Sequence, residues 1–136
     1  MIEFTALLLV ATFFGGMMLY SFGFAPIVFS ALPAEDASRF IRAAFPWYYL
    51  FVIVTACFGG LILLLLNPLS SALVLLIATG AVYARQVLIP RINAARDNQL
   101  QGDSGAMRRF GRLHGLSVAL NFAQLFATGY VLYRFL

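Results

Sequence analysis

Long apolar stretches divide the chain, with short polar segments between them. The first stretch, Phe4 to Leu32, carries no charge, and about 20 apolar residues suffice for a helix to cross a bilayer. A second uncharged run, Ala43 to Ala84, is too long for one span, and Asn67 and Pro68 supply a turn signal near its middle. We therefore expect a tight helical hairpin there. The pattern predicts an all-α integral membrane protein, a four-helix transmembrane bundle with helices over about 2–31, 45–66, 70–92 and 104–135.

Prolines set two of the expected boundaries. Pro26 should kink the end of the first helix, because the carbonyl near Phe22 loses its donor. Pro46 suits the first turn of the second helix, where a missing N–H costs nothing. Residues 31–44 are then expected to form a polar link with at most a short interfacial turn.

Capping residues indicate the remaining helix ends. Ser70 or Ser71 is expected to cap the third helix, and Asp103 or Ser104 the fourth. Pro90 should end or bend the third helix, with a short amphipathic extension beyond it.

The basic residues indicate an orientation. All nine are arginines, and Arg134 alone lies near the outer end of the fourth helix. The others lie in or beside the first and third connections: Arg39, Arg42, Arg85, Arg91, Arg96, Arg108, Arg109 and Arg112. Short arginine-rich connections stay cytoplasmic, so both termini are expected outside, which is periplasmic for a bacterial inner membrane.

Aromatic residues and arginines have further expected roles. Trp47, Tyr48 and Tyr49 are expected as anchors at the inner boundary, and Tyr130 and Tyr133 at the outer one. Five arginines of the third connection are candidates for binding anionic lipid head groups, although they could serve topology alone: Arg91, Arg96, Arg108, Arg109 and Arg112. Because the arginines flank apolar spans that hold the aromatic residues, we expect no nucleic-acid partner.

Composition narrows the class of protein. The 136 residues are 62% hydrophobic and 10% charged, whereas soluble domains average roughly 45–50% and about 25%. The length suits a single domain, residues 1–136. No carboxylate or arginine lies in the middle of a span, where proton relays and ion-coupled transporters usually keep one. No nucleophile elbow, metalloprotease helix or phosphate loop is present, so an enzyme is not the first expectation.

A polar stripe runs down the last helix. His114, Ser117, Asn121, Gln124 and Thr128 recur at steps of three and four, which places them on one helical face. Because hydrocarbon offers no hydrogen-bond partners, this face must point at protein or trapped water.

Depth divides the stripe into two parts. Asn121 and Gln124 lie near the midplane, level with glycines of the other helices, and should hold the bundle together where it is narrow. His114 and Ser117 lie in the inner third, with expected neighbours in residues 21–26, 47–49 and 83–86. The candidate ligand-binding residues are His114, Ser117, Asn121, Gln124, Tyr83 and Tyr20.

Metal and haem chemistry has one candidate. His114 is the only histidine, and its level offers no second histidine, cysteine or carboxylate. It could be an axial haem ligand or a neutral, hydrogen-bonded side chain. Met17, Met18 and Cys57 suggest copper(I), but adjacent methionines point about 100° apart on a helix. The sequence requires no cofactor.

Several segments together resemble a known family. They are GGMMLYSFGFAPIVFSAL, PWYYLF, LIPRINAARD and RFGRLHGLSVALNFAQL, and the most specific pattern places Phe110, His114, Ser117 and Asn121 at F-x-x-x-H-x-x-S-x-x-x-N. They resemble the bacterial transmembrane-protein-205-like family, also catalogued as a domain of unknown function. The resemblance implies a small four-helix inner-membrane protein of unsettled activity. The eukaryotic relative's association with resistance to platinum drugs hints at metal or drug handling.

Three functions are compatible with these patterns. The first is binding or transport of a small molecule, lipid or metal in a pocket beside the last helix. The second is a haem- or metal-dependent membrane oxidoreductase that uses His114. The third is a structural or assembly protein whose polar stripe is a homo-oligomer interface.

Overall fold

The chain folds into helices only. The computed structural model describes all residues, 1–136, and contains no strand. The elements are α1 (Ile2–Met18), the π-helical segment η1 (Leu19–Phe24), α2 (Ala25–Ala31), α3 (Ala34–Leu63), α4 (Pro68–Tyr83), the π-helical segment η2 (Ala84–Leu88), α5 (Ile89–Leu100) and α6 (Ser104–Tyr133). They join into four rods long and apolar enough to cross a membrane: Ile2–Ala31, Ala34–Leu63, Pro68–Leu100 and Ser104–Tyr133. The prediction of a four-helix membrane protein is confirmed.

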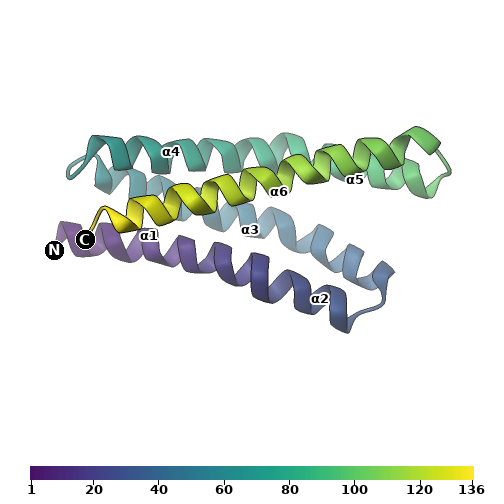
Figure 1. The fold of residues 1–136 in the computed structure, drawn as a ribbon, viewed down its shortest axis with the longest axis horizontal. Coiled ribbons are helices and arrows are strands. Elements are labelled where there is room, and N and C mark those ends of the chain that lie inside the picture. The colour runs from purple at the N-terminus through teal and green to yellow at the C-terminus, as the bar shows by residue number, and fades with distance from the viewer.

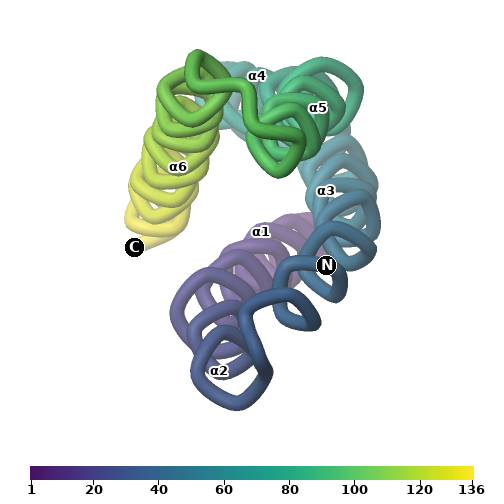
Figure 2. Tube along the Cα trace, turned by 90° about the vertical axis from the view of Figure 1, so that its right-hand side faces the viewer, coloured from purple at the N-terminus to yellow at the C-terminus, as the bar shows by residue number.

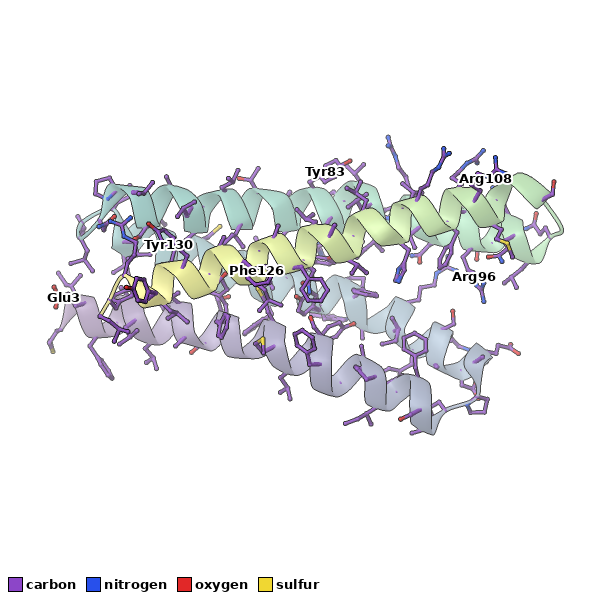
Figure 3. All side chains as sticks on the ribbon, in the orientation of Figure 1. Glu3, Tyr83, Arg96, Arg108, Phe126 and Tyr130 are labelled. Atoms are coloured by element: carbon purple, nitrogen blue, oxygen red, sulfur yellow. The ribbon has the colours of Figure 1, made fainter.

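The arginine-bearing connections lie at one end of the bundle. Figure 1 shows the α2–α3 and α5–α6 turns together at one end, and the two termini with the α3–α4 turn at the other. Arg96 and Arg108 mark the first end in Figure 3, and Glu3 and Tyr130 the second. We call the first the arginine end. A helix of 30 residues is about 45 Å long against a hydrocarbon core of about 30 Å, so the rods extend beyond the core.

The second rod begins earlier than expected. α3 starts at Ala34 rather than near 45, and Pro46 lies inside it instead of opening it. Glu35 and Asp36 stand in its first turn and pair with Arg39, which stabilises a helix start. Ala37 and Ile41 bury against Val28 of α2. Residues 34–44 are therefore an amphipathic helix that packs back on α2, not a polar link.

Two prolines coincide with changes of helical register. η1 ends two residues before Pro26, and the N–H of Ala25 bonds to the carbonyl of Tyr20, five residues back. η2 likewise ends two residues before Pro90, with Ile89 bonded to Ala84. The third rod therefore continues past Pro90 to Leu100, so it is longer than the helix expected over about 70–92 and includes the extension expected beyond Pro90. A proline removes one donor, and a π turn is one way to adjust the bonds around it.

The caps differ from expectation at one helix and agree at another. Asn67 caps α4, where its side chain accepts a bond of 3.0 Å from the N–H of Ser70. Neither predicted serine caps this helix, because Ser71 is buried and donates to the carbonyl of Gly60 at 2.7 Å. Asp103 caps α6, as predicted, and accepts from the N–H of Gly105 at 2.9 Å.

Glycines permit close packing where the rods are tightest. A Cβ on Gly80 would lie 2.8 Å from the Nε2 of Gln124, and one on Gly60 would lie 2.7 Å from Leu75. Gly15, by contrast, has nothing within 4 Å of such an atom. The midplane glycines thus include both packing residues and at least one without a packing role.

The rods separate toward the arginine end. α2 and α6 stand apart there in Figure 1, and the end-on view of Figure 2 shows the same separation, with α3, α4 and α5 on the other side. Of the predicted inner anchors, only Trp47 is exposed, whereas Tyr48 and Tyr49 are buried in the core. Consecutive helical residues point about 100° apart, so three neighbours cannot all face lipid.

Candidate functional site

A cleft opens between α2–α3 and α5–α6 at the arginine end, and it consists of two adjoining cavities. The mouth cavity measures about 270 Å³ and the inner cavity about 310 Å³. Both have mostly apolar walls. Five residues line both cavities: Phe29, Ile41, Phe45, His114 and Ser117.

Each cavity adds its own lining to those five residues. The mouth cavity adds Ala34, Ser38, Arg42, Ile89, Ile92, Asn93, Arg96 and Phe110. The inner cavity adds Tyr20, Ser21, Phe22, Ala25, Pro26, Tyr48, Tyr49, Val118, Asn121 and Phe122. The guanidinium groups of the cleft therefore lie only at its mouth, and all of its tyrosine hydroxyls lie in the inner cavity.

A hydrogen-bonded group forms the polar wall of the inner cavity. The Tyr48 hydroxyl donates to Oδ1 of Asn121 at 2.6 Å, and the Asn121 amide donates to the Ser21 hydroxyl at 2.9 Å. These bonds join three rods. Tyr20 stacks on Tyr48 with ring centroids 4.2 Å apart, and its buried hydroxyl has no hydrogen-bond partner. η1 supplies both Tyr20 and Ser21, so the π-helical register helps to position this wall.

An ion pair spans the mouth between α3 and α5. Arg42 donates from Nη1 and Nη2 to the two carboxylate oxygens of Asp97, at 2.7 and 2.9 Å. Farther along the mouth, Arg96 lies over the ring of Phe110, 5.6 Å from its centroid. Figure 3 shows Arg96 pointing from α5 toward the side of α2 and α3, and Arg108 pointing away.

His114 and Ser117 lie where the two cavities meet. The imidazole of His114 is exposed in the cleft and stacks parallel on Phe110, with ring centroids 5.6 Å apart. Ser117 lies one turn farther along and is buried. Arg96, Phe110 and His114 thus form a continuous stack along the wall of the mouth.

The predicted ligand-binding residues are only partly brought together. Tyr20, His114, Ser117 and Asn121 share the inner cavity. Gln124 lies outside it and joins α6 to α4, since its Nε2 donates to the carbonyl of Ile77 at 3.1 Å. Tyr83, also outside both cavities, is exposed on α4 on the side away from α1 and α2 (Figure 3). Asn121 and Gln124 both hold helices together, which is the structural role expected for them.

The arginines considered for lipid head groups also differ in placement. Arg96 is half-buried against Phe110 and donates to Oε1 of Gln99 at 3.0 Å. The other four are exposed: Arg91, Arg108, Arg109 and Arg112. Only Arg96 of this set lines the cleft.

The sequence predicts some of the cleft residues and not others. Tyr48 and Tyr49 are expected both at the membrane boundary and as neighbours of His114, and they share the inner cavity with it. Arg42 is expected to act in topology only, yet it lines the mouth. Ser38 was missed because residues 31–44 were interpreted as a link. The alternation of Ala37 and Ile41 with charged residues was the available signal for an amphipathic helix there.

The structure holds no cluster of three or more His, Cys, Asp or Glu side chains that could hold a metal ion. His114 is accordingly the single candidate ligand in the cleft. Met17 is fully buried in the core and Met18 is exposed, in agreement with their divergent directions.

Comparison with known proteins gives one match. The model of the domain of unknown function DUF4149 matches residues 8–101. The chain belongs to this family. The DUF4149 region contains η1, α2, α3 and α5, which form most of the cleft, and ends before α6. Neither the curated proteins nor the solved structures include a match to the chain.

Proposed function

We propose that this DUF4149 protein binds or transports a small amphipathic molecule in the cleft. The observation that carries the proposal is the pair of adjoining cavities that share His114 and Ser117. Ligand sites are concave and mostly apolar, with a few convergent polar groups. The cleft has that composition, because apolar walls separate the guanidinium groups of Arg42 and Arg96 from the hydroxyl groups of the inner cavity.

The unpartnered hydroxyl of Tyr20 supports this proposal. Buried polar atoms nearly always have a hydrogen-bond partner, and an exception calls for an explanation. Tyr20 lines the inner cavity beside the bonded group of Tyr48, Asn121 and Ser21. Its hydroxyl is free to bond to a ligand, whereas those of its neighbours are engaged.

The wider setting is part of the same proposal. We place the protein in a bacterial inner membrane as a single domain with both termini periplasmic, supported by the gathering of arginine-bearing connections at one end. We further propose kinship with the transmembrane-protein-205-like family, supported by Phe110, His114, Ser117 and Asn121, three of which line the inner cavity.

The two alternative functions receive less support. The polar stripe of α6 bonds inside one chain, through Asn121, Gln124 and Thr128, so it does not itself require a second copy. A haem function would depend on His114 alone, and Soret absorbance of the purified protein would reveal it.

Photolabelling in the membrane tests the proposal. A neutral monoacylglycerol with a diazirine in its chain is added to the protein in phosphatidylcholine nanodiscs, and labelled peptides are mapped by mass spectrometry. We expect labels on cleft residues of α2 and α6, in addition to lipid-facing residues such as Phe126. Ser38→Phe, which fills the mouth, should remove the cleft labels, whereas Ser30→Phe, outside both cavities, should keep them. Labels confined to lipid-facing residues would refute the proposal.

A further inference from the structure

The charge of the mouth cavity distinguishes among amphipathic ligands. Two guanidinium groups, of Arg42 and Arg96, line it, and no carboxylate does. Asp97 neutralises Arg42 from outside the lining. Arg96 has only the neutral amide of Gln99 and the ring of Phe110, so its charge remains uncompensated. The mouth is thus complementary to an anion.

The mouth lies at the depth of lipid head groups. Arg42 stands about 32 Å along α3 from Leu63 at the other end of the rod, close to the hydrocarbon thickness of about 30 Å. An arginine at this depth can hold its stem on apolar surface and its guanidinium among head groups. The guanidinium of Arg96 itself lies over the ring of Phe110 in the mouth.

The inner cavity meets the lipid-facing surface of the bundle. Phe22 of η1 and Phe122 of α6 line this cavity and are also exposed on the outside of the protein. Their rings meet edge to face with centroids 5.9 Å apart, where the first and fourth rods separate. An acyl chain in the inner cavity would have apolar walls along Phe29, Ile41 and Phe45 as far as the mouth.

We infer that the occupant of the cleft is an anionic phospholipid of the surrounding leaflet. Its phosphate lies against Arg96 and Arg42 in the mouth, and one acyl chain passes His114 and Ser117 into the inner cavity. This inference rests on the proposed function and names its ligand. It assigns lipid binding to Arg96, which lines the cleft, and not to the exposed arginines at the same end, which lie outside it.

Native mass spectrometry of the full chain in detergent measures the binding. Phosphatidylglycerol and phosphatidylcholine of identical acyl chains are titrated separately, and the affinity of the first bound lipid is compared. One basic residue near a membrane surface contributes about 1 kcal/mol, so phosphatidylglycerol should bind at least about fivefold tighter. Arg96→Gln should abolish this preference, and Arg134→Gln, at the opposite end, should leave it unchanged.

Further variants distinguish lipid binding in the cleft from lipid binding elsewhere on the protein. The double variant Arg42→Gln/Asp97→Asn removes a neutral ion pair without leaving an unpaired carboxylate, so its preference for phosphatidylglycerol should persist as long as Arg96 is present. Ser38→Phe should lower the affinity for both lipids, because the new side chain blocks the space that both would occupy. If Arg109→Gln, at an exposed position, lost as much of the preference for phosphatidylglycerol as Arg96→Gln, the binding would belong to the outer arginines and the inference would be overturned.

The inference and the proposed function fail differently. Equal affinities for the two lipids, with cleft labelling by the neutral monoacylglycerol intact, would overturn the anionic ligand and leave the cleft as a binding site. Absence of cleft labelling together with equal affinities would overturn both.

Discussion

The bond between Tyr48 and Asn121 is expected to couple α3 to α6 energetically. The hydroxyl donates to Oδ1 of Asn121 at 2.6 Å, and the Tyr48 side chain is only 7% exposed. Asn121→Leu removes this bond and the one to Ser21, and an apolar side chain then faces both hydroxyl groups. An unsatisfied buried group costs about 1–3 kcal/mol, so this variant should lose about that much unfolding free energy.

A double-mutant cycle isolates the single bond. Tyr48→Phe deletes the donor, and the double variant Tyr48→Phe/Asn121→Leu deletes both partners. Side-chain hydrogen bonds between membrane helices average about 0.6 kcal/mol and reach about 1.7 kcal/mol. The short distance and low exposure favour a value above the average, so we expect a coupling energy near 1 kcal/mol.

Reversible unfolding in mixed micelles, followed by the helical circular dichroism signal, gives the four free energies. Tyr130→Phe is the matched control, because Tyr130 is exposed on the same helix as Asn121 and is not one of its hydrogen-bond partners. Its cycle with Asn121→Leu should be additive within about 0.3–0.5 kcal/mol. A coupling between Tyr48 and Asn121 inside that same margin would refute the argument that the inner wall holds the rods together.

Two further predictions concern packing and orientation. Gly80→Ala should cost about 1–3 kcal/mol of unfolding free energy in the same assay, because the new Cβ would lie 2.8 Å from the Gln124 amide nitrogen. Gly15→Ala, whose Cβ meets no other atom, should stabilise the fold by about 0.5–1 kcal/mol. Equal effects of the two substitutions would contradict the packing role of Gly80. Orientation is tested by cysteine labelling in intact cells, with a membrane-impermeant maleimide and a chain that lacks the native cysteine. Leu65→Cys in the α3–α4 turn should react and Gln101→Cys should not. The reverse pattern would refute the proposed orientation.

The sequence predicts the number of rods, their class and the inward polar face because those properties depend on local composition and periodicity. Uncharged length defines a span, and spacings of three and four place Ser117, Asn121, Gln124 and Thr128 on one side. All four residues are buried or half-buried. The inward direction is therefore predicted correctly for these four positions of the stripe, whereas His114 is exposed in the cleft, and Asn121 and Gln124 bond to neighbouring helices.

The start of α3 and the shape of the cleft depend on contacts that composition does not encode. Pro46 looked like a helix start, but the packing of Ala37 and Ile41 on Val28 extends the helix twelve residues toward the N-terminus, to Ala34. Tyr83 looked like a neighbour of His114 from depth alone, yet it faces away around the axis of α4. Depth follows from residue counting, whereas the direction of a side chain around its helix depends on how the helices pack.

The cleft itself follows from how the first rod ends. Pro26 cannot donate to the turn before it, and the helix takes a π register through η1, with Ala25 bonded to Tyr20. Beyond this point α2 packs on α3 through Val28, Ala37 and Ile41 and stands apart from α6. The same local change therefore supplies Tyr20 and Ser21 to the inner wall. It also leaves the half of α6 nearer the arginine end without a helix opposite it. His114 and Ser117 face that space, which is why a stripe that bonds within the bundle at midplane lines a cavity near the arginine end.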